Sequence, residues 1–266
     1  MTQHFMMRDG VNFSGFDVGQ GSPVIFQHGL GGDIGQINES FPHLDLRRLT
    51  LECRGQGQSE FGNAKQFSIS QFADDVLAFA DQRGVDKFVM GGISMGAAIA
   101  LRIAVIAPDR VEALILARPA WNWDISPENM SVFKLLADYV EKRDKAGFEA
   151  TAVADNFAIN APDNYASLLR LFDKTNPKMI AKLHHDIASS GPEVSEQQVR
   201  GLAIPTLVMA NAIDIIHPIA VAQKLSAAIP NSRFIEIAPK AIDRAKHFAE
   251  FHAAVTDFLK DNEVIN

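Results

Sequence analysis

Residues 91–96 read Gly-Gly-Ile-Ser-Met-Gly, which places one serine among three glycines. The preceding stretch KFVM (87–90) is typical of a short strand, and the following stretch AAIALRIAVIA (97–107) is typical of a helix. Ser94 is therefore predicted at the turn between a buried strand and a helix. Glycines permit unusual backbone dihedral angles and close contact between backbones. A Gly-x-Ser-x-Gly turn of this kind raises the serine side chain above the sheet.

Two interpretations of Ser94 are open at this point. Serine is a favoured N-cap residue, whose oxygen accepts a hydrogen bond from an amide of the first helical turn. Serine is also a nucleophile where a base, an acid that orients the base and a pair of backbone amides accompany it. The second interpretation therefore requires further parts elsewhere in the chain.

The composition limits the classes of protein and partner. The chain has 266 residues, of which 47% are hydrophobic, and this length suits one large α/β domain. A formal net charge of −7 argues against a nucleic-acid partner and against an anionic membrane. Cys53 is the single cysteine, so no internal disulfide is possible and a reducing compartment is favoured.

The sequence also bears on the cellular location. The first ten residues, MTQHFMMRDG, lack the basic start and the long apolar run of a signal peptide. The apolar runs elsewhere are far shorter than the ~20 residues that a membrane span needs. We therefore expect a soluble, cytoplasmic protein.

Strand-like and helix-like segments alternate through most of the chain. A hairpin is predicted within 5–21, because Asp9-Gly10 separates two β-like runs. Further strands are predicted over residues 23–29, 47–55, 87–94, 111–120, 206–211 and 233–238, and helices over 69–84, 95–107, 220–229 and 247–260. This alternation predicts an α/β fold with a mostly parallel, doubly wound sheet that helices cover on both faces.

Residues 121–203 break the alternation. They contain no convincing strand and read as several helices, with apolar residues clustered over 133–140 and 165–172. An insertion of this size beside a site favours a helical lid, or cap, that excludes water and shapes a pocket. An additional packing layer is the alternative. The predicted core domain then comprises residues 1–120 and 204–266.

Polar residues follow several of the predicted strands, at the edge of the sheet where the chemistry of open α/β folds collects. They occur in QHGLGG (27–32) and RGQGQS (54–59) and as Ser94, Asp214 and His247. A serine, an aspartate and a histidine thus follow strands in that order along the chain. This is the chain order of nucleophile, acid and base in one class of hydrolytic triad.

Five motifs make the sequence resemble the α/β-hydrolase fold family, namely HGLGG (28–32), RGQGQS (54–59), GISMG (92–96), NAIDIIHP (211–218) and KHF (246–248). The resemblance covers nearly the whole chain outside 121–203. It is strongest to the small lid-bearing members of the enol-lactonase, carboxylesterase and C–C bond hydrolase types. In that family a proline usually follows the acid by a few residues, as Pro218 follows Asp214 here.

One motif departs from the family pattern. The family usually has Asp-x-Arg-Gly at the second loop, whereas this chain has Glu52-Cys53-Arg54-Gly55. That loop is structural in most relatives, so the departure leaves the triad prediction intact. The resemblance also implies a structural role for His28, which usually holds the glycine loop by hydrogen bonds.

The resemblance implies Ser94 as nucleophile, His247 as base and Asp214 as acid. A serine hydroxyl needs a base within hydrogen-bonding reach, and the ordinary pKa of histidine suits that task near neutral pH. The aspartate fixes the imidazole tautomer and stabilises the imidazolium that forms. The backbone amides of Met95 and Leu30 are implied as the oxyanion hole, aimed at the charge that develops on the carbonyl oxygen.

Four aromatic residues of the insertion are candidate walls of the substrate pocket: Trp121, Trp123, Phe133 and Tyr139. The two tryptophans directly follow a predicted strand at the start of the insertion. Large aromatic side chains suit an apolar acyl or ring pocket, and they equally suit the packing of the cap on the core.

Two further histidines are rivals of His247 as base. His217 lies three residues after Asp214, and His252 lies within the final predicted helix. Adjacent His184 and His185 resemble metal ligands, but neighbouring residues of a helix point about 100° apart, so no metal site is predicted.

Two other features are given no chemistry. Cys53 ends a predicted strand and is interpreted as a small buried hydrophobic residue. Gly55 and Gly57 resemble part of a dinucleotide loop, but the required helix start does not follow them, so no nucleotide is expected.

We expect a serine hydrolase without a cofactor that cleaves a small carboxylic ester or lactone through an acyl-enzyme, with the lactone favoured by the resemblance. C–C bond hydrolysis of a ring-cleavage product, perhydrolysis and a lyase reaction are alternatives for the same triad. A ligand receptor with slow hydrolysis is the alternative from another class. The substrate and the oligomeric state do not follow from the sequence, because specificity depends on cap side chains.

Overall fold

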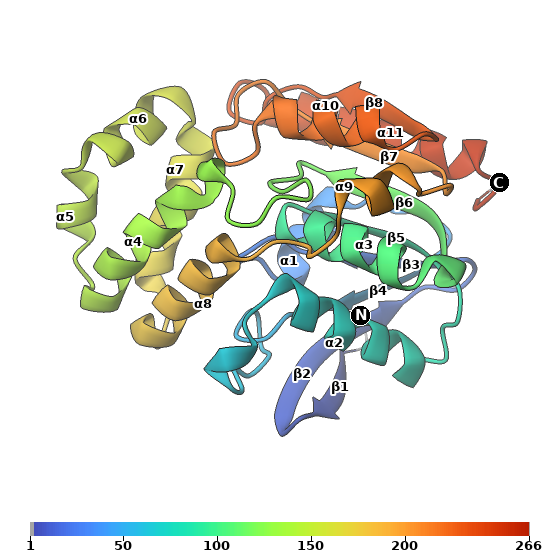
Figure 1. The fold of residues 1–266 in the computed structure, drawn as a ribbon, viewed down its shortest axis with the longest axis horizontal. Coiled ribbons are helices and arrows are strands. Elements are labelled where there is room, and N and C mark those ends of the chain that lie inside the picture. The colour runs from blue at the N-terminus through green and yellow to red at the C-terminus, as the bar shows by residue number, and fades with distance from the viewer. Residues whose placement is uncertain (1–2, 266) are drawn as a thin grey trace.

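The computed structural model describes residues 3–265, which form one eight-stranded sheet in the order β1-β2-β4-β3-β5-β6-β7-β8 (Figure 1). The strands are β1 Gln3–Arg8, β2 Val11–Val18, β3 Pro23–Gln27, β4 Arg47–Leu51, β5 Phe88–Ile93, β6 Val111–Ala117, β7 Thr206–Ala210 and β8 Ser232–Glu236. Strand β2 is antiparallel to both its neighbours, and the other pairings are parallel. The predicted α/β class and mostly parallel sheet are confirmed.

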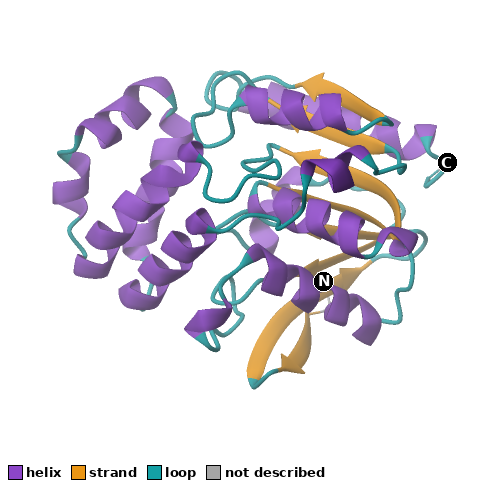
Figure 2. Cartoon of the chain, in the orientation of Figure 1, coloured by secondary structure: helices purple, strands orange, loops and turns teal. Residues whose placement is uncertain are grey.

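Helices join the parallel strands, as Figure 2 shows. They are α1 Ile34–Ser40, α2 Ile69–Gln82, α3 Met95–Ile106, α4 Ser131–Lys142, α5 Lys145–Glu149, α6 Ala152–Asn160, α7 Pro162–Leu169, α8 Pro177–Ser189, α9 Glu196–Arg200, α10 Ile219–Ala228 and α11 Arg244–Asp261. Short 3-10 helices are η1 Ala64–Gln66, η2 Pro108–Arg110, η3 Glu128–Met130 and η4 Arg170–Asp173. Within residues 3–265, no helix has both the length and the apolar character needed to cross a membrane.

The N-terminal hairpin forms at the predicted turn. Asp9 and Gly10 have φ angles of 52° and 73°, and Arg8 pairs with Val11 across them. A two-residue turn with positive φ at both positions matches the twist of the flanking strands, which explains the preference for Asp-Gly.

Helices cover both faces of the sheet and create two apolar layers. Buried residues of α2, α3, α9 and α10 share one cluster, and those of α1 and α11 share the other. Every residue of β5 is buried, as expected for a central strand between two helical layers. The carboxyl ends of β3, β5, β6 and β7 thus point toward one edge of the sheet.

Helices α4 to α8 gather at that edge, on the left of Figure 1, where α4 packs against α8. The described part of 121–203 contains no strand, as predicted. Helix α9 lies in the same range of sequence but contacts α3 and α10, so it packs with the core rather than with α4 to α8. The role of these helices as a lid stays a prediction, and we call α4–α8 the cap.

The two ends of the cap segment are tied together. The carbonyl of Ser190 accepts hydrogen bonds from the backbone N–H of Ser126 and from the indole N–H of Trp121, both at 3.0 Å. The chain therefore leaves the core and returns to it at nearly the same point.

The last helix begins earlier than the sequence suggested. The predicted start was His247, but α11 begins at Arg244, because the Asp243 carboxylate caps it by accepting from the Lys246 N–H at 2.9 Å. His247 therefore lies inside the first turn of a helix and not in the loop before it.

The turn between β5 and α3 lies against the end of β3. A Cβ added at Gly96 would lie 2.2 Å from the carbonyl oxygen of Gln27, and one added at Gly92 would lie 2.4 Å from the carbonyl carbon of Gly96. Backbone atoms fill the space that a side chain would need, so both positions require glycine.

Gly96→Ala is expected to lower the free energy of unfolding by about 3 kcal/mol, because the new methyl group overlaps backbone that cannot move independently. An ordinary Gly→Ala change inside a helix would instead stabilise the protein by about 1 kcal/mol, so the sign is informative. Urea unfolding followed by circular dichroism measures the difference. The control is Gly84→Ala, where φ is +65° and no atom lies within 4 Å. A loss at Gly96 no larger than at Gly84 would contradict the close contact.

Candidate active site

Ser94 occupies the sharp turn between β5 and α3. Its φ and ψ are 57° and −113°, a conformation that costs about 1–3 kcal/mol in a residue other than glycine. Its hydroxyl makes no capping hydrogen bond to α3, which removes the support for the N-cap interpretation. The side chain is mostly buried, and no hydrogen bond to its Oγ occurs among residues 3–265.

The loop after β3 presents one amide without a partner. Gly29 N–H donates to Gln36 Oε1 at 2.7 Å, and Gly31 N–H donates to Gln56 Oε1 at 2.6 Å. Between them, the N–H of Leu30 makes no hydrogen bond within the described part of the chain. Two glutamine side chains thus fix the loop and leave the Leu30 amide available.

The two amides predicted for an oxyanion hole belong to segments that touch. A Cβ added at Gly29 would lie 3.3 Å from Ser94 Cβ, so the Leu30 loop packs directly against the serine. Met95 is the first residue of α3, and an N–H at this position has no acceptor within its own helix. Their joint role as an oxyanion hole stays a prediction.

His28 holds the Leu30 loop to the neighbouring strand. Its Nε2 accepts from the Cys53 N–H at 3.0 Å, and its Nδ1 lies 2.8 Å from the Gly29 carbonyl, to which it donates. Burial lowers the pKa of His28, which keeps the ring neutral and in this tautomer. These contacts agree with the structural role expected for His28.

Glu52, where the family usually has aspartate, also serves the loops. Its carboxylate accepts from the Gln58 N–H at 2.8 Å and from the Ile34 N–H at 3.2 Å. A Cβ at Gly57 would lie 2.1 Å from the Glu52 carboxyl carbon, so the longer acid fits because this position is glycine.

Asp214 is buried and accepts hydrogen bonds from two cationic or polar partners. Its Oδ2 accepts from Arg118 Nε at 2.9 Å and Nη2 at 2.5 Å. Its Oδ1 accepts from His217 twice, through the backbone N–H at 3.0 Å and Nδ1 at 2.8 Å. Burial alone would raise the pKa of Asp214, but the charge of Arg118 and the hydrogen bonds from His217 and Arg118 outweigh it and hold the pKa well below its usual range.

His217 is oriented by Asp214. Because Nδ1 lies 2.8 Å from a carboxylate oxygen, it must carry the proton, and Nε2 is then the basic nitrogen. That Nε2 is buried and has no hydrogen-bond partner among the described residues. Burial lowers the pKa of His217, with Asp214 opposing and Arg118 reinforcing the shift.

His247 makes no hydrogen bond to the Asp214 pair among the described residues. Its Nδ1 donates to the Ala238 carbonyl at 2.8 Å, and no hydrogen bond joins it to Asp214 or Ser94 within residues 3–265. Burial and the nearby charges of Arg118 and Lys240 lower its pKa. The arrangement expected from the sequence, in which Asp214 orients His247, is therefore not found, and the rival histidine takes that place.

Two cavities adjoin these residues. A small one of about 40 Å³ is lined in part by Gln36, Ile93, Arg118, Lys240 and His247. A larger one of about 410 Å³, which we call the cap cavity, lies between the Leu30 loop and the cap. Its lining residues are Leu30, Gly31, Gly32, Asp33, Gln36, Glu39, Phe133, Ser167, Leu168, Arg170, Leu171, Lys174, His184, Lys240 and Arg244.

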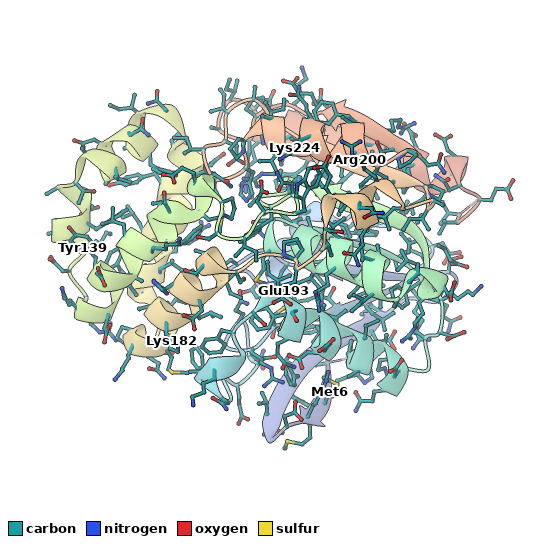
Figure 3. The ribbon with its side chains drawn as sticks, viewed as in Figure 1. Met6, Tyr139, Lys182, Glu193, Arg200 and Lys224 are labelled. Carbon is teal, nitrogen blue, oxygen red and sulfur yellow. The ribbon has the colours of Figure 1, made fainter. Side chains whose placement is uncertain are left out.

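Of the four aromatic residues proposed for the pocket, Phe133 alone lines the cap cavity. Trp121 is buried in the core, Trp123 lies beneath the Lys224 ammonium at 4.5 Å, and Tyr139 packs on Phe148. Figure 3 shows Tyr139 at the side of the cap away from the sheet. The structure thus assigns packing contacts to the other three.

The remaining candidates carry no site. His184 is buried with its Nδ1 against the Ile180 carbonyl, whereas His185 is exposed, as expected for neighbours on a helix. No group of three potential metal ligands occurs among the described residues. The Nε2 of His252 is buried without a partner, and burial raises the pKa of the Cys53 thiol.

Sequence reasoning missed Arg118 and Lys240. Arg118 directly follows the apolar strand β6 and has a φ of 46°. A charged residue at the carboxyl end of a central parallel strand was an available signal. Lys240 lies in the loop before α11, and its position depends on where that helix begins.

An α/β sheet with a strained serine at the carboxyl end of a central strand defines the class of α/β hydrolases. The family model for the alpha/beta hydrolase fold matches residues 22–249. The chain belongs to this family.

Several individual relatives share the fold and are named as hydrolases. The 3-oxoadipate enol-lactonase 2 of Acinetobacter baylyi is 23% identical over 264 residues, covering 94% of this chain and 93% of that protein. The enol-lactonase of Burkholderia xenovorans LB400 superposes with a TM-score of 0.76 at 21% identity, covering 97% and 100%. A thermophilic esterase of Thermogutta terrifontis, with malate bound, gives a TM-score of 0.76 at 22% identity, covering 98% and 99%. The family and these relatives support a hydrolase.

Asp214→Asn is expected to lower the free energy of unfolding by about 3 kcal/mol at pH 7, because Arg118 loses its buried counter-charge. The carboxylate has a depressed pKa, so its stabilisation is present above the unfolded pKa of about 3.9 and is lost as the pH falls further. The gap between wild type and variant should therefore shrink below that pH. Urea titrations at pH 7 and 3 measure this. Asp186→Asn, which removes a half-exposed pair with Lys182, is the control.

Proposed function

We propose that this protein is a serine hydrolase that cleaves a small carboxylic ester or lactone through an acyl-enzyme. The observation that carries the proposal is the state of Ser94, a strained residue whose Oγ makes no hydrogen bond to the part of the chain that the structure describes. Strain of this kind persists where the surrounding structure enforces it, and it concentrates at active sites. The enol-lactonase and esterase relatives favour esters and lactones over a C–C bond.

The reaction takes two steps. Ser94 Oγ attacks the carbonyl carbon and gives its proton to a histidine Nε2, while the oxyanion accepts from the Leu30 and Met95 amides. The tetrahedral intermediate collapses to the acyl-enzyme, and the leaving alkoxide takes the proton. A water then attacks the acyl carbon, the histidine again accepts the proton, and the acid leaves as Ser94 regains its hydrogen.

We propose His217 as that histidine, in place of His247. A base needs an orienting acceptor on Nδ1 and a free Nε2 that faces the nucleophile. Asp214 supplies the acceptor to His217, which supports this assignment. No hydrogen bond joins His217 Nε2 to Ser94 Oγ among the described residues, and catalytic hydrogen bonds often form fully only in the complex with substrate. His247, held by a backbone carbonyl, is the alternative base.

Ser94→Ala should lower kcat for a short p-nitrophenyl ester by about 10⁴-fold or more, because the attacking oxygen is gone. Labelling by a fluorophosphonate probe should disappear with it. The control Ser131→Ala removes an exposed hydroxyl on α4 and should keep both. A wild-type protein that takes neither probe nor ester, with its melting temperature intact, would favour the ligand receptor.

His217→Asn should lower kcat/KM by about 10⁴-fold or more, whereas His247→Asn should change it less than about 10-fold. The exposed His185→Asn is the control. Because the pKa of His217 is lowered and the base acts in its neutral form, the acidic limb of the wild-type pH profile should lie below pH 6.5. The opposite order of the two variants would assign the base to His247.

A further inference from the structure

Three cationic side chains from distant segments approach one another beside the nucleophile. Lys240 precedes α11, Arg118 ends β6 and Arg170 begins η4 in the cap. Burial lowers the pKa of Lys240, and the charges of Arg118 and Arg170 lower it further, although Asp163 opposes them. Lys240 shares the lining of the small cavity with Arg118 and that of the cap cavity with Arg170.

Lys240 lines both cavities, as Gln36 and Glu39 also do. It lines the small cavity together with Ile93, which directly precedes the nucleophile, and it lines the cap cavity together with Leu30. A ligand in the cap cavity whose carbonyl lies at the Leu30 amide therefore extends toward a half-buried ammonium.

The counter-charges do not balance these cations. The cap cavity is lined by four cationic side chains and two carboxylates, namely Arg170, Lys174, Lys240 and Arg244 against Asp33 and Glu39. Glu39 is shared, since it pairs closely with Arg244 and lies 4.0 Å from the Lys240 ammonium. Lys174 has no ion pair among the described residues, which leaves the cavity with an excess of positive charge.

We propose that the cap cavity binds a carboxylate on the substrate, held by Lys240 with Arg170 at its margin. The substrate is then a monoanion, such as a half-ester of a short dicarboxylic acid or a lactone that bears a carboxylate. Repulsion among the cations costs free energy in the empty protein, and a bound anion relieves it. A short chain with one charged end and one ester end suits a cavity of about 410 Å³ that is also lined by apolar Phe133 and Leu171.

This inference rests on the proposed function, which identifies the second end of the substrate as the ester. It predicts that the protein prefers an ester that carries a carboxylate over the corresponding neutral ester. Monomethyl glutarate and dimethyl glutarate share a methyl ester and the chain length, and the carboxylate of the first is replaced by a second, neutral methyl ester in the other.

The first experiment measures kcat/KM for both esters in wild type and in Lys240→Gln. Loss of a charge-assisted contact should lower the value for monomethyl glutarate by about 10- to 100-fold and leave dimethyl glutarate within about 3-fold. Lys246→Gln is the matched control, because Lys246 is exposed on the first turn of α11 and pairs with Glu250. An equal fall for both esters, or no change for either, would overturn the proposal.

The second experiment is independent of turnover. Calorimetry with Ser94→Ala protein should detect glutarate but not neutral glutaramide, and added salt or Lys240→Gln should weaken the binding. If glutarate binds while no ester is hydrolysed by wild type, the carboxylate site stands and the proposed function fails. If esters are hydrolysed without regard to charge and glutarate does not bind, the carboxylate site fails alone. Melting temperatures of both lysine variants confirm that they are folded.

Discussion

The site depends on a contact between backbones. The carbonyl of Gln27 at the end of β3 lies where any side chain at Gly96 would stand, so the start of α3 is pressed against the neighbouring strand. This contact fixes the distance between the Leu30 loop and the Met95 amide. Hydrogen bonds that the Gly29 and Gly31 amides donate to Gln36 and Gln56 then fix the direction of the loop. Two amides are thereby oriented in advance, and such preorganised donors are the form in which proteins stabilise developing charge most effectively.

The second constraint is electrostatic. Asp214 is a buried carboxylate, and its burial is tolerable because Arg118 and His217 provide four hydrogen bonds to it. The same arginine lies beside His247 and Lys240 and lowers the pKa of each. Arg118 thus couples the buried acid to the cationic side of the site. A substitution of Arg118 therefore changes the charge beside Asp214 and also beside Lys240.

The sequence predicted the fold in detail because each element carries its own local signal. Asp9-Gly10 determines the hairpin, and the glycines around Ser94 determine the turn after β5, since both depend on backbone conformations that few residues adopt. It was harder to predict from the sequence which side chains of the site pair with one another. His217 and His247 both follow a strand, and the choice between them depends on where α11 starts. That start is set by a single cap hydrogen bond, which the Lys246 N–H donates to the Asp243 carboxylate. The side chains that surround Arg118 and Lys240 come from distant segments of the chain, and hydrophobic periodicity does not predict such contacts.

Because the two ends of the cap segment lie together, the cap can change in sequence and length with little effect on the sheet. The Ser190 carbonyl accepts hydrogen bonds from Ser126 and Trp121. The cap segment is therefore a long loop that leaves the core and returns to it at one place. The entropic cost of closing such a loop grows only slowly with its length. Helices within it can lengthen, shorten or be replaced while β6 and β7 keep their pairing. A change within the cap segment therefore leaves the sheet and its serine in place.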